Sequence, residues 1–489
     1  MKCAIFKKIG LQINDRMVKN FIKGILPIAF SLSILSGYGQ NPIIQTKFTA
    51  DPAPLVYHDT VFLYTGHDED DAPSGMGGFR MKDWLCYTSS DMVNWTDHGP
   101  VASLKNFTWA DKAVSGWGGF DNGAWASQCI ERDGKFYLYC PIQGRGIGVL
   151  MADNPLGPFT DAIGKPLIGG KFDSIDPTVF IDEDGQAYLY WGNPNLWYVK
   201  LNKDMISYSG EPVKDNSVAK IKGQADPFHY QEGPWAYKRN GRYYMAYAST
   251  CCPEGIGYAM SESPTGPWTF KGYVMRPNGK SSGNHPGIID YKGRSYVFGF
   301  NYQLNSLLTD KHHERRSVCA AELTYAPDGT IPELPWWQEE GVTQPGTLNP
   351  FIRTEAETIS WSQGVKTAKD SITGGIYVTN INNGDFIEVR GADLKNGVKF
   401  FEARLAPGTG GVIEIHLDSL NGRIAGVASV KGSRQTGGWK KNSARQTRDW
   451  KNYSARMEKA HGVHDLFWVF KGGEGNLFDF DWWKFNPVR

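Results

Sequence analysis

The chain has 489 residues, enough for two or three domains, and its 52 basic and 51 acidic residues leave a net charge of +1. This balance lacks the strong positive field that nucleic-acid binding and anionic membranes require, so we expect no nucleic-acid partner. Aromatic residues make up 13% of the chain and 57 residues are Gly. Abundant Gly suits many tight turns between short strands, and aromatic faces beyond those needed for a core are typical of sugar-binding proteins.

Residues 1–39 have the pattern of a signal peptide. Lys19 and Lys23 precede an apolar run over residues 24–35, and small residues then lead to a cleavage site before Gln40. The apolar run is too short to cross a bilayer, although an uncleaved anchor is the alternative interpretation. We therefore expect a secreted or periplasmic protein with no membrane span in the mature chain.

Seven cysteines are present, and Cys3 belongs to the predicted leader. The six that follow form an even set, which permits disulfides in an exported protein, but their spacing fits no disulfide scaffold or zinc site. Cys251 and Cys252 are adjacent. They allow three alternatives: a vicinal bridge, pairing with other cysteines, or buried free thiols.

An internal repeat organises the first two thirds of the chain. Each copy has a polar or aromatic residue, an apolar stretch, a tight turn such as Asn240-Gly241, and an aromatic-rich strand. Recurring hairpins followed by outer strands are typical of β-propeller blades, whereas a continuous sandwich would not explain the shared order. We predict an all-β chain in which residues 40–330 form a five-bladed β-propeller. The five copies begin at Asp51, Trp125, Asp176, Glu232 and Asn284.

These starting positions are equivalent, so in a propeller they should face the central axis. Asp51, Asp176 and Glu232 are carboxylic acids, and the fifth copy supplies His285 one residue after its start. A single acid before proline is usually a turn residue. Three acids around one axis raise one another's pKa, which costs free energy unless the protein uses it.

The three acids suit glycoside hydrolysis, in which one carboxylic acid protonates the leaving oxygen and one carboxylate acts from the other face. We predict that Glu232 is the acid, because its side chain is longer and Trp235 and Tyr237 surround it with apolar surface that helps it keep a proton. Asp51 is then the general base that activates water. Asp176 tunes the pKa of the acid and holds the sugar. Two blade steps between acid and base leave room for water and hence for inversion.

The same residues carry a family resemblance. Ala50-Asp51-Pro52, the segment 174–180 around Asp176, and Glu232-Gly233-Pro234 resemble the base, pKa-modulator and acid motifs of glycoside hydrolase family 43. The resemblance implies a five-bladed propeller and an inverting enzyme that acts on arabinose- and xylose-containing glycans.

Three further residues gain expected roles from this resemblance. His285, in Asn284-His285-Pro286, resembles a histidine beneath the active site that often lies beside a calcium ion. Arg316 resembles an arginine that contacts the sugar. Trp125 precedes Ala-Ser instead of the family's usual Ala-Pro, and it is expected to form a wall of a sugar subsite.

Residues 331–351 are proline-rich and lack periodicity, which predicts a linker that packs on the propeller through Trp336 and Trp337. Residues 352–489 alternate between apolar and polar positions. This pattern predicts a β-sandwich module of the jelly-roll type.

The C-terminal segment resembles carbohydrate-binding module family 6 along its whole length, on the strings 355–357, 383–385, 436–439 and 475–482. The resemblance implies a structural calcium ion and a sugar cleft, and no organic cofactor is expected. Asn380 stands where many members carry an aromatic residue, so sugar binding is expected to be weakened. The implied calcium ligands are Glu355, Glu357 and Asp481, and the implied cleft residues are Trp439 and Asn476.

The expected substrate is plant cell-wall arabinoxylan or its oligosaccharides, with α-L-arabinofuranose as the released sugar. An exo-acting β-1,4-xylosidase is the alternative, because the two sugars overlap closely in shape. A non-catalytic sugar-binding propeller would be expected to lose an axial acid, yet all three are present. A retaining fructan-type enzyme would need Asn-Asp-Pro-Asn, whereas this chain has Thr49-Ala50-Asp51-Pro52. The sequence leaves the oligomeric state open.

Overall fold

The computed structural model describes residues 38–111, 119–170, 173–219, 226–279, 284–433 and 448–488. The predicted signal peptide lies outside these ranges, except for its last two residues. The regular secondary structure of the described residues is almost entirely β-strand, as predicted, with a single α-helix, α1 (Gln303–Leu308). No helix within these ranges has the length and apolar character needed to cross a bilayer. Three short 3-10 turns also occur: η1 (Leu104–Asn106), η2 (Thr108–Ala110) and η3 (Gly119–Asp121).

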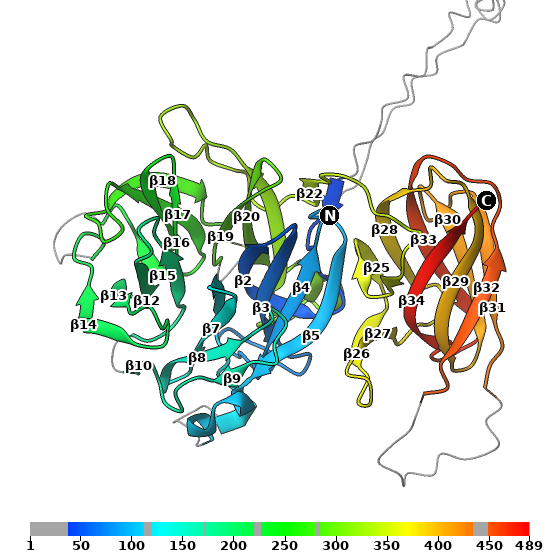
Figure 1. The fold of residues 1–489 in the computed structure, drawn as a ribbon, viewed down its shortest axis with the longest axis horizontal. Helices are drawn as coiled ribbons and strands as arrows, with labels where there is room; N and C mark the ends of the chain where they lie inside the picture. The colour runs from blue at the N-terminus through cyan, green and yellow to red at the C-terminus, as the bar shows by residue number, and fades with distance from the viewer. Residues whose placement is uncertain are drawn as a thin grey trace, which may run out of the picture. The chain divides into compact units, whose positions relative to one another are not determined.

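Five antiparallel sheets follow one another along the described residues between Phe48 and Leu323. Figure 1 shows them in chain order from blue to green. The first two sheets contain β2 (Phe48–Tyr57), β3 (Thr60–Asp68), β4 (Asp83–Ser89) and β5 (Trp95–Ser103), then β6 (Gln128–Arg132), β7 (Lys135–Ile142), β8 (Gly146–Ala152), β9 (Thr160–Asp161) and β10 (Ile168–Gly169). The third contains β11 (Thr178–Ile181), β12 (Ala187–Trp191), β13 (Trp197–Leu201) and β14 (Tyr208–Lys214). The last two contain β15 (Tyr230–Arg239), β16 (Arg242–Ser249), β17 (Gly255–Ser261) and β18 (Thr269–Met275), then β19 (Gly287–Tyr291), β20 (Arg294–Asn301) and β21 (Ser317–Leu323).

The predicted hairpins are the first two strands of these sheets. Asn240 and Gly241 connect β15 to β16, and both have positive φ (49° and 76°), which an Asn-Gly turn accommodates without a large steric cost. Across this hairpin Tyr237 stacks on Tyr244 with ring centroids 4.9 Å apart. Such aromatic cross-strand pairs stabilise the sheet and fix its register.

The first strands of the five sheets contact one another in a closed order, β2 to β6, β11, β15, β19 and back to β2. Their starting residues therefore meet around a common centre. A buried cluster that includes Tyr64, Trp84, Leu138, Trp235 and Trp337 packs around these strands. The repeat alignment thus identified the strands that build the centre of this region.

The C-terminal module has two sheets around one shared core, which includes Phe401, Trp468 and Trp483. Trp468 and Trp483 are fully buried with ring centroids 4.9 Å apart. One sheet contains β23 (Thr354–Glu355), β26 (Lys366–Lys369), β27 (Ile376–Thr379), β29 (Val398–Pro407), β32 (Lys451–Arg456) and β34 (Phe478–Pro487). The other contains β25 (Trp361–Gln363), β28 (Phe386–Asp393), β30 (Gly411–Leu417), β31 (Ile424–Val430) and β33 (Val463–Gly472).

The connecting segment is more ordered than a simple linker. Its strand β22 (Glu340–Thr343) pairs with β1 (Tyr38–Gln40), and Trp337 is buried as expected. Beyond it, β24 (Thr358–Ile359) adds an edge strand to the first sheet by pairing with β5. The segment therefore packs along its length and shields hydrogen-bonding strand edges.

The structure also settles the pairing of the adjacent cysteines. Cys251 and Cys252 form a disulfide with each other in the turn between β16 and β17. Cys86, Cys129, Cys140 and Cys319 are free and buried, which is common for small apolar side chains.

Ring closure predicts an intolerance to added volume at Gly287. A Cβ there would lie 2.4 Å from Pro54 Cδ and 2.6 Å from the Pro52 carbonyl oxygen of β2. We expect Gly287→Ala to destabilise the protein by about 1–3 kcal/mol, because overpacking would force the first and last sheets apart. Chemical denaturation followed by tryptophan fluorescence measures this change. The control is Gly169→Ala, where nothing lies within 4 Å of the added Cβ, and equal midpoints for the two variants would contradict the closure argument.

Candidate active site

Each predicted catalytic acid lies at a backbone irregularity near the start of a first strand. Asp51 and Asp176 have φ of 52° and 56°, a region that non-glycine residues seldom adopt. The register of β2 shifts just after Asp51, and that of β15 shifts on both sides of Glu232. Bulges of this kind redirect a side chain out of the regular alternation, and strained backbone tends to accumulate at functional sites.

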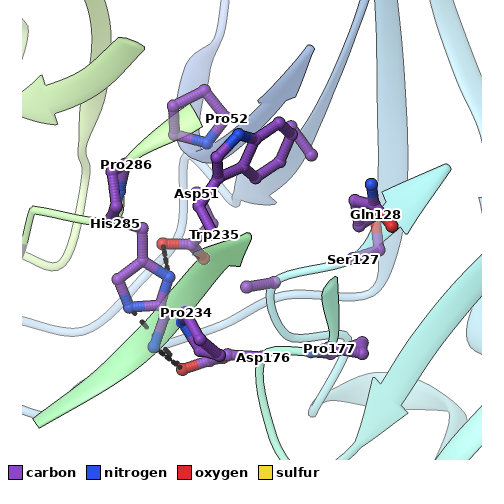
Figure 2. Close-up of a pocket in the computed structure, with 13 residues that line it drawn as sticks. Asp51, Pro52, Ser127, Gln128, Asp176, Pro177, Pro234, Trp235, His285 and Pro286 are labelled. Carbon is purple, nitrogen blue, oxygen red and sulfur yellow. Dashed lines mark hydrogen bonds and ion pairs between the residues drawn. The ribbon is translucent and has the colours of Figure 1, made fainter. Parts of the chain in front are cut away.

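His285 lies at the centre of the three acids. Its Nδ1 is 3.5 Å from Asp51 Oδ1, while its Nε2 is 3.1 Å from Glu232 Oε1 and 3.7 Å from Asp176 Oδ2. Figure 2 shows the imidazole between the carboxylates of Asp51 and Asp176. The structure thus brings together the three acids that the repeat alignment placed at the axis. In the fifth repeat, His285 faces them in place of the aligned residue Asn284, which is fully buried. Opposite nitrogens of one ring face Asp51 and Glu232, so the ring separates these two carboxylates.

A buried arginine holds Asp51 from the other side. Arg316 donates from Nη1 to Asp51 Oδ1 at 2.8 Å, and from Nε and Nη2 to the two oxygens of Asp68 at 2.9 Å each. The bidentate pair fixes the plane of the guanidinium, which in turn orients Asp51. Burial raises the pKa of Asp68, and the adjacent Arg316 opposes that rise. The structure therefore gives Arg316 a role in holding Asp51, while its expected contact with sugar stays a prediction.

Glu232 is the most accessible of the three acids. Its side chain is 18% exposed, against 4% for Asp51 and 3% for Asp176. Asn193 donates a hydrogen bond to Glu232 Oε2, which leaves the carboxyl group anchored at one oxygen and beside His285 at the other. This accessibility agrees with a residue that must reach the substrate.

The pKa shifts differ from the sequence-based expectation for Glu232. Burial alone would raise the pKa of Glu232, but the hydrogen bond and charge of His285 lower it overall. Asp176 instead has a pKa well above its ordinary value, because it is buried and near the carboxylates of Glu232 and Asp51. Burial disfavours charge on His285 as well, yet the surrounding carboxylates raise its pKa well above the usual value. The sequence argument counted the like charges and omitted the effect of the central histidine on Glu232.

A pocket of about 520 Å³ opens above these groups. Its wall includes Trp125, with Phe79 packed edge-on at a centroid distance of 5.5 Å, while the expected role of Trp125 in a sugar subsite stays a prediction. Gln143 accepts a hydrogen bond from the Trp125 indole and also lines the pocket. Flat aromatic surface combined with a few fixed polar groups is typical of small-ligand sites.

The sequence analysis missed four residues that shape this site: Asp68, Phe79, Gln143 and Asn193. Asp68, Gln143 and Asn193 lie at or just after the end of the second strand of a repeat, three or four residues after its last Tyr. Extending the repeat alignment past the second strand would have found these three.

Of the two predicted sugar-cleft residues of the module, the structure describes only one. Trp439 lies outside the described residues. Asn476 accepts a hydrogen bond from the Ile381 amide at 2.8 Å and donates one to Asp479 at 3.1 Å, so its side chain organises a turn within the module. Asn380 is exposed and donates to the Gly364 carbonyl.

Two of the three expected calcium ligands of the module pair with an arginine, and the third does not. Glu355 accepts from Arg353 and Asp481 from Arg404, at 2.8 and 2.7 Å. Glu357 is buried, and its Oε2 has no hydrogen-bond partner among the described residues. Burial, followed by the nearby charges of Glu355, Asp97 and Asp481, raises the pKa of Glu357 well above its ordinary value. A buried carboxylate without a partner suits the oxygen-rich surroundings of calcium.

The Arg316–Asp68 pair predicts a stability effect that is separate from chemistry. We expect Asp68→Ala to cost about 3–5 kcal/mol, because a fully buried guanidinium would lose its bidentate partner. The loss should appear as a lower denaturation midpoint. The control is Asp71→Ala, which removes the exposed partner of Arg80 and should change the midpoint little. Similar midpoints for the two variants would show that Asp68 does not anchor Arg316.

Known families match both parts of the chain. Residues 39–331 match the family described as glycosyl hydrolases family 43, and residues 355–487 match the carbohydrate binding module of family 6. Both resemblances inferred from the sequence are thereby confirmed.

Individual relatives extend the match over most of the chain. The sequence is 35% identical to an arabinoxylan arabinofuranohydrolase of Bacillus subtilis (strain 168), across 91% of this chain and 92% of the relative. It is 30% identical to a beta-xylosidase of Xylanibacter ruminicola, across 59% of this chain and 97% of the relative. A crystal structure of a family 43 arabinoxylan arabinofuranohydrolase from Bacillus subtilis, in complex with cellotetraose, superposes with a TM-score of 0.76 at 34% identity, covering 92% of this chain and 97% of that one.

The matched ranges, the two-part likeness and the acids gathered around His285 lead to one conclusion: the chain belongs to glycosyl hydrolases family 43 and carries a carbohydrate binding module of family 6.

Proposed function

We propose that this protein is a secreted, inverting α-L-arabinofuranosidase that removes arabinofuranose side chains from arabinoxylan. The convergence of Asp51, Asp176 and Glu232 on His285 beneath an open pocket carries the proposal. The likeness to the arabinoxylan arabinofuranohydrolase of Bacillus subtilis spans both the enzyme region and the module, which favours a polymeric substrate. We further propose that the five sheets are the blades of a β-propeller and that the module is a jelly-roll sandwich.

In the proposed reaction Asp51 is the general base. It removes a proton from a water molecule that attacks the anomeric carbon, and the hydrogen bond from Arg316 orients its carboxylate. Glu232 gives a proton to the glycosidic oxygen as the bond from that oxygen to the anomeric carbon breaks. Because opposite nitrogens of His285 face these two acids, the ring leaves room for the water that inversion requires.

Asp176 and His285 help to keep a proton available beside Glu232. Both have raised pKa values and lie beside Glu232, so the three groups share protons and titrate as one unit. Protonation of this unit keeps a proton next to the leaving oxygen even though the pKa of Glu232 itself is lowered. Asp176 thus serves as modulator through a shared proton.

Release of β-D-xylose is the second candidate activity. The beta-xylosidase of Xylanibacter ruminicola aligns with 59% of this chain, which is the enzyme region without the module. The two sugars present similar hydroxyl patterns to the same acids, so the walls of the pocket decide between them.

Calcium is proposed as a structural ion of the module. Glu357 would hold it together with Glu355 and Asp481, and the ion would neutralise carboxylates that otherwise repel each other. A small cavity beside His285 is a second candidate cation site, since the hydroxyl of Ser127 on its wall is buried without a partner among the described residues. The mechanism proposed above uses neither ion.

Two variants separate the acid from the base. We expect Glu232→Gln and Asp51→Asn each to lower kcat/KM on arabinoxylan by roughly 100-fold or more. On para-nitrophenyl arabinofuranoside, whose leaving group needs little protonation, Glu232→Gln should lose far less activity than Asp51→Asn. Proton NMR of the first product should show the inverted anomer. Asp133→Asn, in an exposed hairpin turn, is the control, and equal losses of Glu232→Gln on both substrates would remove its role as acid.

The calcium proposal predicts a metal-dependent stability. We expect calcium to raise the melting temperature of the wild type and a chelator to lower it, since an ion that binds only the folded state stabilises it. Glu357→Gln should abolish this response, whereas Glu474→Gln, at an exposed position, should keep it.

The stability of the metal-free protein should depend on pH through the carboxyl group of Glu357. Because the pKa of Glu357 is raised on folding, the chelated wild type should become more stable as the pH falls through that raised value toward the ordinary pKa of a glutamate. Thermal melts of Glu357→Gln should lack this component. A calcium response that persists in Glu357→Gln would place the ion elsewhere.

A further inference from the structure

Asn284, directly before His285, is fully buried and bonded to three separate parts of the chain. Its backbone N–H donates a hydrogen bond to Glu254 Oε2 at 3.1 Å. Its side-chain oxygen accepts from the Phe300 amide and from the Trp337 indole, each at 3.3 Å. The residue that carries the central histidine in the chain is therefore fixed at both its backbone and its side chain.

Glu254 reaches Asn284 from the turn between β16 and β17. It is 1% exposed, and a buried carboxylate is costly unless it accepts hydrogen bonds. None of the proposed catalytic steps uses it. The described contact of its Oε2 is the Asn284 amide, so its visible structural effect is to hold the backbone at the start of the Asn284-His285-Pro286 segment.

Trp337 reaches the same point from the segment that leads toward the module. The indole and Asn284 lie flush against Gly299 of β20, where an added Cβ would be 2.4 Å from both. The hydrogen bond from the Trp337 indole to Asn284 Oδ1 therefore forms in a closely packed space that leaves neither group room to move.

This support is transmitted directly to the ring of His285. On one side Gly233 lies so close that a Cβ there would be 3.0 Å from His285 Cγ. Phe300, whose backbone N–H donates to Asn284 Oδ1, also contacts the histidine. Its ring centroid lies 6.1 Å from that of His285 and 5.1 Å from the Arg316 guanidinium. A shift of Asn284 would therefore move the histidine relative to Asp51 and Glu232.

We propose that Glu254 and Trp337 are positioning residues that act through Asn284 to hold His285 between the catalytic carboxylates. The inference rests on the proposed hydrolase function for its kinetic consequence. It also extends the functional unit beyond the repeated strands, because Trp337 lies after β21, the last strand of the fifth sheet. Displacement of a catalytic group by about 1 Å can cost on the order of 100-fold in rate.

The test compares full-length Glu254→Ala, Glu254→Gln and Trp337→Phe with the wild type on para-nitrophenyl arabinofuranoside and xyloside. Glu254→Ala should lower kcat at least about tenfold with little change in KM, because the displaced group acts in the transition state. Glu254→Gln keeps an oxygen that accepts from the Asn284 amide and should restore most of kcat. Trp337→Phe keeps the ring but loses the indole donor, and it should lower kcat to a lesser extent. The controls are Glu262→Gln, exposed in the next turn, and Trp336→Phe.

A second readout does not depend on activity. Nitrogen-15 spectra of histidine-labelled protein report the ring of His285, assigned through its loss in His285→Gln. Its signals should shift in Glu254→Ala and Trp337→Phe and stay unchanged in both controls.

Three results would overturn the inference: unchanged His285 signals, a lowered denaturation midpoint with wild-type kcat, or equal damage by Ala and Gln at position 254. An inert wild type would refute the proposed function instead, and the nitrogen spectra would still decide whether His285 is positioned in this way.

Discussion

The centre of the enzyme region depends on a balance of buried charge. Asp51, Asp68, Asp176 and Glu232 would repel one another strongly at the junction of the sheets without His285 and Arg316. Burying these two cations alone would be equally unfavourable, so each charge makes the others tolerable. The closed ring of first strands brings the groups together, and the network fixes them to within hydrogen-bond distances. The same network that stabilises the fold thus sets the protonation states on which hydrolysis depends.

The sequence predicted the elements of this site better than their energetics. Asp51, Asp176 and Glu232 could be found because a repeated hairpin places equivalent residues at equivalent points in space. The lowered pKa of Glu232 could not be inferred from the sequence. It depends on the approach of His285 Nε2 to within 3.1 Å of Glu232 Oε1, which only the folded structure shows. An extended repeat alignment would have marked the position of Asp68, but its pairing with Arg316 could not be inferred, since the two residues are distant in sequence and meet only after the ring has closed.

The module shows a similar limit. Alternating patterning predicted its strands, and the family resemblance supplied Glu355, Glu357 and Asp481 as a set. The structure adds that arginines neutralise two of these carboxylates and leave Glu357 unpartnered. Sequence spacing contains no information on that asymmetry, because it arises from the contacts of Arg353 and Arg404. Only coordinates could therefore identify Glu357 as the carboxylate with the strongest need for a cation.

The buried position of Trp337 bears on how such proteins exchange modules in evolution. The last strand of the fifth sheet, β21, ends at Leu323, yet the indole that braces Asn284 and the strand that pairs with β1 both come later, up to Thr343. A recombination event that joined a new module directly after the sheets would discard part of the support beneath the active site. Viable fusion points should therefore lie beyond Thr343. The stretch up to Thr343 is therefore structurally a part of the enzyme region and more than a spacer before the module.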